Sequence, residues 1–232
     1  MNEVFNRYTV AYILLDGSID IKKVCEIFTQ INSKGIKLDI FDLLNAILKP
    51  HDDLRLKELW RENSHLITYS EDQKLKVYVL QIMSIWLQNY CAPKYLYYLV
   101  PNSKKVIRHK DGTKEETRLI KSSEEFKNHW HKAFKALNKG FKILSNSKDY
   151  GAINSRFLPY LTLTPLFSAI NHLIDNKQEI NKQDAKQKLK LFYWANIFTQ
   201  NYSGSTESKS ARDYVLLQNW FNNNDKEPEV IQ

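Results

Sequence analysis

The stretch SSEEFKNHWHKAFKALNKGFKIL, residues 122–144, decides the fold class of this chain. Its large apolar residues recur at intervals of three and four positions, which is the spacing of one face of an α-helix. Ser122 and Glu125 form a capping box, so the helix is expected to begin there. The expected core-facing residues are Phe126, Trp130, Phe134, Leu137, Phe141 and Leu144.

The rest of the chain has the same helical character. Only 6 Gly and 6 Pro occur in 232 residues, and folds made of many strands need more turns than these residues supply. Pro165 lacks a backbone donor and is expected to break or kink its helix. Asn181 is expected to cap one helix, and Ser210 with Asp213 the last one. Further helices are expected in residues 20–34, 39–49, 54–65, 74–89, 157–174, 181–197 and 210–221.

Two segments have β character. Residues 8–15, YTVAYILL, are rich in aromatic and aliphatic residues and end at Asp16-Gly17, which predicts one strand and a turn. A single strand needs partners, and we expect them from sequence that precedes Met1. Residues 102–121 are the most charged segment, and Asp111-Gly112 within it indicates a hairpin near 104–120 or a mobile loop. The predicted fold is therefore mostly α, a multi-helix bundle-like domain with one N-terminal strand.

The positive charge of the chain makes DNA a plausible partner. The formal net charge is +8, and a basic chain attracts polyanions through counterion release. Lysine-rich solvent faces would give the same charge without any ligand. Residues that could contact phosphates gather in the charged segment, although Asp111, Glu115 and Glu116 dilute them and a solvated loop remains the alternative. They are Lys104, Lys105, Arg108, Lys110, Lys114 and Arg118.

Cysteine usage and hydropathy point to a protein of the reducing cytoplasm. Cys25 and Cys91 are the two cysteines, and each lies in a helical apolar pattern that predicts a buried free thiol. The most apolar segment, residues 77–92, is interrupted by polar residues, so no membrane span is expected. The interrupting residues are Gln81, Ser84, Gln88 and Asn89.

Residues that could bind a metal occur in two places, but neither pattern favours a site. His129 and His131 are two positions apart, which on a helix separates their side chains by about 200°. The run His51-Asp52-Asp53 follows Pro50 and is typical of a solvated turn. We therefore expect no metal site. One functional hypothesis, to which two others are added below, is a stand-alone enzyme that uses these residues.

Three motifs carry a resemblance to a known family. Residues 26–46 read EIF..INSKG..L...DLLNA, residues 158–160 read LPY, and Trp194 is followed by NYSGS at residues 201–205 and by Asp213. In this order the motifs resemble the domain-of-unknown-function family 262. That family includes the GmrSD-type modification-dependent restriction nucleases.

The resemblance implies a division of the chain and several partners. In the family, a domain similar to ParB and sulfiredoxin precedes a helical region, and an HNH nuclease domain often follows. Residues 1–50 would be the end of the ParB-like domain and residues 51–232 the helical domain. The D-G-Q-Q-R motif linked to nucleotide hydrolysis does not occur in this sequence. A nucleotide and a divalent metal are therefore implied only for a full-length parent, and no cofactor is expected in this chain.

Two functions follow as hypotheses. The first is a non-catalytic helical portion of a restriction-type, phage-defence nuclease that positions DNA or couples domains. The missing N- and C-terminal domains would be its partners. Asn32, Lys34 and Gly35 would form a structural joint and the edge of a ligand site. The second is a protein-interaction module, with self-association through residues 8–15 or the first helix, where an unpaired strand edge would invite pairing.

Overall fold

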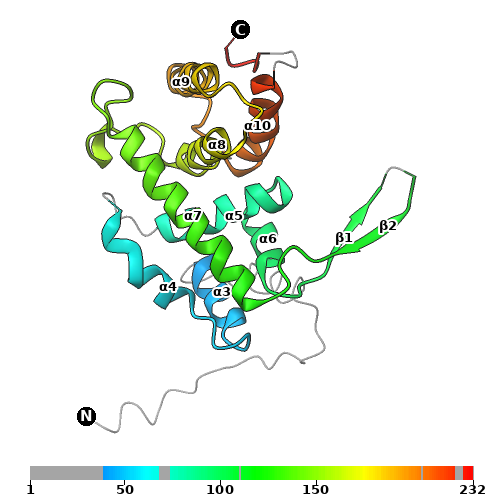
Figure 1. Cartoon of the computed structure of the whole chain (residues 1–232). Coiled ribbons are helices and arrows are strands. Elements are labelled where there is room, and N and C mark those ends of the chain that lie inside the picture. The colour runs from blue at the N-terminus through cyan, green and yellow to red at the C-terminus, as the bar shows by residue number, and fades with distance from the viewer. Residues whose placement is uncertain (1–38, 68–73, 110, 205, 223–226, 232) are drawn as a thin grey trace, which may run out of the picture. The chain divides into compact units, whose positions relative to one another are not determined.

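Helices form most of the structure, a computed structural model that describes residues 39–67, 74–109, 111–204, 206–222 and 227–231 (Figure 1). The α-helices are α3 (Ile40–Leu48), α4 (Leu56–Asn63), α5 (Leu75–Gln88), α6 (Pro93–Leu96), α7 (Ser123–Leu144), α8 (Thr164–Asn176), α9 (Lys182–Phe198) and α10 (Thr206–Phe221). The 3-10 turns are η1 (Ser64–Leu66), η2 (Tyr97–Leu99), η3 (Ser155–Phe157) and η4 (Leu161–Leu163). The strands are β1 (Lys105–Arg108) and β2 (Lys114–Thr117).

This architecture confirms the mostly-α prediction. Of the two structures expected for the charged segment, a hairpin or a mobile loop, it shows the hairpin. β1 and β2 pair in antiparallel fashion as a two-stranded sheet. The expected strand at residues 8–15, the helix at 20–34 and Cys25 lie outside the described residues. The sequence also suggests a capping box at Ser70 and Gln73 ahead of α5, and it too lies outside the described residues.

Chain contacts divide the protein into residues 1–38 and residues 39–232. α3 belongs to the second unit, where it packs against α4 and α5. The ring of Phe41 in α3 lies 6.2 Å from the ring of Trp130 in α7, so α3 shares the core of the helices that follow. Among the described residues the compact unit thus begins at Asp39, and the domain boundary expected after residue 50 stays a prediction.

The long helix α7 supplies the centre of the core, as its apolar spacing predicts. It packs against α5 and α8, and all six of its predicted apolar residues are buried. Ser122 caps it, with its hydroxyl accepting from the Glu125 N–H at 3.1 Å. The Glu125 carboxylate accepts from the Lys121 N–H at 2.7 Å, so the reciprocal bond reaches one residue further back than in a standard capping box.

The start of α8 corrects the prediction for residues 157–174. Residues before Thr164 form the turns η3 and η4, and the Leu158-Pro159-Tyr160 motif lies between them. Pro165 occupies the first turn of α8 and does not kink it. A proline is well suited to this position because the first N–H groups of a helix have no intrahelical acceptor.

The last helix also starts elsewhere than expected. α10 begins at Thr206, so Ser210 and Asp213 lie inside it and do not cap it. Both are buried, and the Asp213 carboxylate binds another side chain instead. By contrast, Asn181 caps α9 as predicted, because its Oδ1 accepts from the N–H groups of Gln183 and Asp184 at 3.2 Å each.

Candidate nucleic-acid interface

The turn of the hairpin is closed by Asp111 and Gly112. Asp111 Oδ1 accepts from the backbone N–H of Thr113 at 2.9 Å and from its hydroxyl at 2.6 Å. These two bonds lower the pKa of the Asp111 carboxyl. Gly112 has φ of 84°, a conformation that glycine adopts without strain. The Asp-Gly pair therefore performs the turn role that the sequence indicates, and Figure 1 shows the hairpin extending beyond α6.

Strand alternation sorts the charged residues of the hairpin onto two faces. Residues two apart on a strand share a face, and so do directly paired residues on the neighbouring strand. The register pairs Val106 with Glu116 and Arg108 with Lys114. We name the face that carries these four residues the basic face. Its members, including the two flanking cations, are Lys104, Val106, Arg108, Lys114, Glu116 and Arg118.

The basic face carries four cations around one carboxylate. Lys104 Nζ lies 3.2 Å from Glu116 Oε1, and Arg118 Nη2 lies 3.8 Å from the same atom. Arg108 and Lys114 are exposed, and the described residues supply neither with an ion-pair partner. Two cations at the outer end of the hairpin are thus available to an anion, and two near its base are partly neutralised. This is a surface that suits a polyphosphate backbone.

Lys105 does not join the other predicted phosphate-binding residues. Alternation places it on the opposite face, where its Nζ donates to Gln88 Oε1 at 2.8 Å. The ammonium also lies 5.7 Å from the ring centre of Tyr90 and 5.8 Å from that of Tyr98. Burial lowers the pKa of Lys105. The predicted set therefore divides between two faces, and Lys110 lies outside the described residues.

Gln88 connects three elements at the foot of the hairpin. Its Nε2 donates to Ser84 Oγ in α5 and to the carbonyl of Tyr95 in α6, each at 2.8 Å. Its Oε1 receives the Lys105 ammonium. In the sequence, Gln88 stands out only as a polar residue that interrupts an apolar segment. That interruption was the available signal, because a polar residue in a buried helix needs hydrogen-bond partners.

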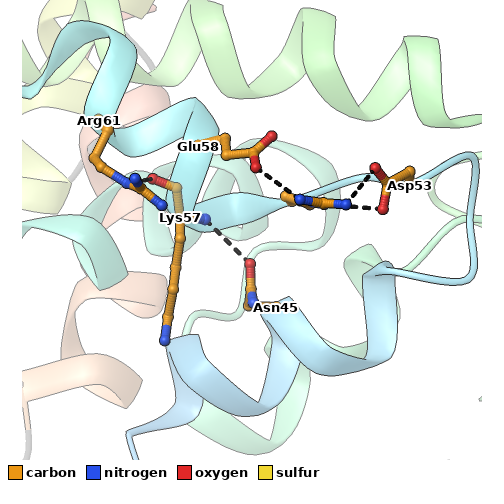
Figure 2. Close-up of polar contacts among 6 residues, drawn as sticks. Asn45, Asp53, Lys57, Glu58 and Arg61 are labelled. Carbon is orange, nitrogen blue, oxygen red and sulfur yellow. Dashed lines mark hydrogen bonds and ion pairs between the residues drawn. The ribbon is translucent and has the colours of Figure 1, made fainter.

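Residues 39–46, the described part of the first motif, connect α3 with α4. Asp42 and Asn45 lie one turn apart on α3, and both contact Lys57 of α4. Asp42 Oδ1 lies 2.9 Å from Lys57 Nζ, and Asn45 Oδ1 accepts from the Lys57 backbone N–H at 3.1 Å, the bond drawn in Figure 2. The predicted joint residues, Asn32, Lys34 and Gly35, lie outside the described residues.

Asn45 acts as a cap for α4 from a neighbouring helix. Arg55 occupies the N-cap position of α4 and makes no side-chain capping bond. Its guanidinium instead contacts Asp53 at 2.8 Å and Glu58 at 3.0 Å. Dashed lines in Figure 2 mark the contacts made by Asp53 and Glu58. The first N–H groups of a helix need acceptors, and Asn45 provides one for Lys57. This motif therefore has a structural role within the described residues.

Two residues of the third motif, Tyr202 and Asp213, bind each other in the core. The Tyr202 hydroxyl donates to Asp213 Oδ2 at 2.8 Å, and both side chains are buried. Burial raises the pKa of Asp213, although the Tyr202 hydrogen bond and nearby Arg212 and Lys209 act in the other direction. Burial also raises the pKa of Tyr202, so its hydroxyl stays protonated as the donor. The pair fastens the loop before α10 to that helix.

The residues considered for metal binding do not form a site. In the described part of the chain, no group of three His, Cys, Asp or Glu side chains could hold a metal ion. Asp52 and Asp53 lie in a left-handed turn with φ of 52° and 51°, and Arg55 binds the Asp53 carboxylate. His129 lies 3.9 Å from Glu125.

Two further predictions about the chain are consistent with the structure. Cys91 is a buried free thiol, and burial raises its pKa to about 12. Its Sγ donates to the carbonyl of Glu207 at 3.2 Å. None of the helices in the described ranges combines the length and the apolar character that crossing a bilayer requires.

Comparison with known proteins yields one distant relative. The uncharacterized protein MJ0686 of Methanocaldococcus jannaschii is 27% identical to this chain over an alignment 248 residues long, gaps included. The alignment covers 99% of this chain. The chain spans 37% of the length of that relative. No family model matches the sequence, and no solved structure matches it.

Proposed function

We propose that this chain is the non-catalytic helical portion of a restriction-type, phage-defence nuclease related to family 262, and that it positions DNA. The observation that carries the DNA role is the basic face of the hairpin. Four cations there surround a single carboxylate, and Arg108 and Lys114 are exposed and unpaired within the described residues. The net charge of +8 adds a general attraction for polyanions.

Two of the three motifs support the family part of the proposal, because each of them has a structural role. Asp42 with Asn45 joins α3 to α4, and Tyr202 with Asp213 fastens the loop before α10. Residues that hold a fold together explain why these motifs would recur without catalysis. This chain spans 37% of the length of its relative. That length is consistent with a helical region that works beside other domains. In such a parent, nucleotide and metal chemistry would belong to those other domains.

Duplex binding by a charge-reversed hairpin tests the DNA role. Arg108→Glu with Lys114→Glu should abolish most of the affinity of the full chain for plain duplex DNA at low salt. The matched control is Lys148→Glu with Lys186→Glu, which changes net charge equally at two exposed lysines far along the chain. Each lost phosphate contact should reduce the slope of log affinity against log salt by about 0.9. Equal losses in both double variants would contradict a specific role for the hairpin.

A second candidate function is a protein-interaction module in which the partner is a second copy of this chain. An apolar stripe on the outer side of α9 favours it. Leu191 is 50% exposed and Phe198 is 79% exposed, and Trp194 between them stacks on Phe198 with ring centres 5.9 Å apart. Light scattering at high concentration should then show a dimer that Phe198→Glu dissociates. A strictly monomeric profile would exclude this function.

A further inference from the structure

Three tyrosines and two lysines cluster at the foot of the hairpin. Tyr90 follows the end of α5, and Tyr95 and Tyr98 belong to the adjoining α6 and η2 segment. The rings of Tyr90 and Tyr95 stack with centres 4.7 Å apart and an angle of 27° between their planes. We name this cluster, which also contains Lys94 and Lys105, the tyrosine platform.

Tyr90 is the most exposed ring of the tyrosine platform, because Tyr95 and Tyr98 are half-buried. Tyr90 is 48% exposed although its ring stacks on that of Tyr95. Asn89, with φ of 56°, ends α5 in the left-handed conformation and turns the chain before Tyr90. The Tyr90 carbonyl accepts from the Ser84 hydroxyl, which fixes the backbone at this residue. The exposed ring is therefore anchored at its base.

The cations of the platform lie over its rings and carry no opposing charge. Lys94 Nζ lies 5.0 Å from the ring centre of Tyr95, and Lys105 Nζ lies between the rings of Tyr90 and Tyr98. Within the described residues neither ammonium has a carboxylate at ion-pair distance. Gln88 holds Lys105 in place through one of its three possible hydrogen bonds, so donors remain for an anion.

A fixed aromatic surface beside unneutralised cations matches one class of ligand. Nucleic-acid bases stack on aromatic side chains through their π-faces, while lysines hold the neighbouring phosphates. We propose that the tyrosine platform binds an unpaired nucleotide of a single strand, with its base stacked on Tyr90 and its phosphate near Lys94 and Lys105. The inference rests on the proposed DNA role. It adds a second contact on the hairpin face opposite the basic face.

Separate variants on the two faces make the inference testable on its own. The probes for the full chain are oligothymidylate, the same sugar-phosphate backbone without bases, and plain duplex DNA. Tyr90→Ala should weaken oligothymidylate binding about 5- to 150-fold, the range that corresponds to one lost base stack. Tyr90→Phe keeps the ring and should bind normally. The base-free backbone should bind wild type and Tyr90→Ala equally, because stacking makes no contribution there.

The control for a general effect of losing an exposed ring is Phe157→Ala, because this side chain is 58% exposed and belongs to none of the proposed surfaces; it should leave oligothymidylate affinity unchanged. Failure of oligothymidylate to bind at low salt would overturn the inference. So would an equal loss for Tyr90→Ala on the base-free backbone. The proposed function fails separately if reversal of Arg108 and Lys114 leaves duplex binding unchanged. In that case a Tyr90 effect limited to oligothymidylate would still support the platform as a single-strand site.

Discussion

Gly140 of α7 lies directly against Ser168 of α8. A Cβ placed at residue 140 would lie 3.1 Å from the Cβ of Ser168 and closer still to its hydroxyl. Ser168 is fully buried, and its hydroxyl has no hydrogen-bond partner among the described residues. The close approach of these two helices in the core thus depends on a missing side chain at one position and a small one at the other.

Gly140→Ala should destabilise the protein despite the better helix propensity of alanine. Alanine gains roughly 0.5–1 kcal/mol over glycine in a helix, whereas overpacking a core costs about 1–3 kcal/mol. We expect the free energy of unfolding to fall by about 1–2 kcal/mol. Urea denaturation followed by circular dichroism measures it.

Ser168→Ala provides a sharp control for this prediction. It removes both the nearest atom and an unsatisfied buried hydroxyl, so alone it should be close to neutral or stabilising. In the double variant the cost of Gly140→Ala should shrink markedly. Gly204→Ala, at a residue with open space around it, should change stability little. Additive effects of the two core substitutions would contradict the contact.

The buried pair of Tyr202 and Asp213 predicts a second stability effect. Tyr202→Phe removes the 2.8 Å hydrogen bond and leaves a buried carboxyl without this donor. Loss of one partner of a buried polar pair costs about 1–3 kcal/mol. Thermal unfolding should show the loss for Tyr202→Phe. Tyr160→Phe, which changes a hydroxyl on a partly exposed residue, should show little change.

Asn45→Ala should weaken the joint between α3 and α4. The side chain caps the Lys57 N–H, and loss of a helix cap costs about 0.5–2 kcal/mol. Lys57→Ala removes only the exposed ion pair with Asp42 and retains the backbone N–H, so it should cost about 0–1 kcal/mol. Denaturant unfolding of both variants compares them. A larger loss for Lys57→Ala would show that the ion pair, and not the cap, dominates.

His172 should give the protein a pH-dependent fluorescence signal. Its ring lies 4.5 Å from that of Trp86, and burial lowers its pKa from the ordinary 6.5, with Lys132 and Lys139 acting in the same direction and Asp175 in the opposite one. The charged imidazolium quenches a nearby indole. Tryptophan emission should therefore drop as the pH is lowered, with a midpoint below pH 6.5. His172→Gln or Trp86→Phe should remove the transition. A midpoint at or above 6.5 would contradict the environment described here.

The same shift has a defined consequence for stability. The folded state disfavours the charged form, so it binds fewer protons than the unfolded state near this pKa. The stability that neutral His172 contributes is therefore fully present above pH 6.5, the ordinary pKa of histidine. It is lost as the pH falls through the lowered pKa of His172 in the folded state. His172→Gln should flatten the stability profile on the acidic side of 6.5.

Local patterns predicted much of the helical framework. The spacing in residues 122–144 and the cap at Ser122 are properties of neighbouring residues, so α7 forms where the sequence indicates. Asn181 caps its helix for the same reason. The starts of α8 and α10 were not predicted, because Pro165 can begin a helix as well as break one. Asp213 resembles a cap in sequence but is bound by distant Tyr202.

By itself, the sequence determined a helical chain, a turn at Asp111-Gly112 and a net positive charge, since each follows from residues close together or from composition. Only the tertiary structure decided which charges share a surface. The strand register places Lys105 on the face opposite Arg108 and Lys114. The hydrogen bond to Gln88 holds the Lys105 ammonium near the rings of Tyr90 and Tyr98. Hydrogen bonds between elements set that arrangement, and they join residues whose spacing along the chain contains no signal of contact.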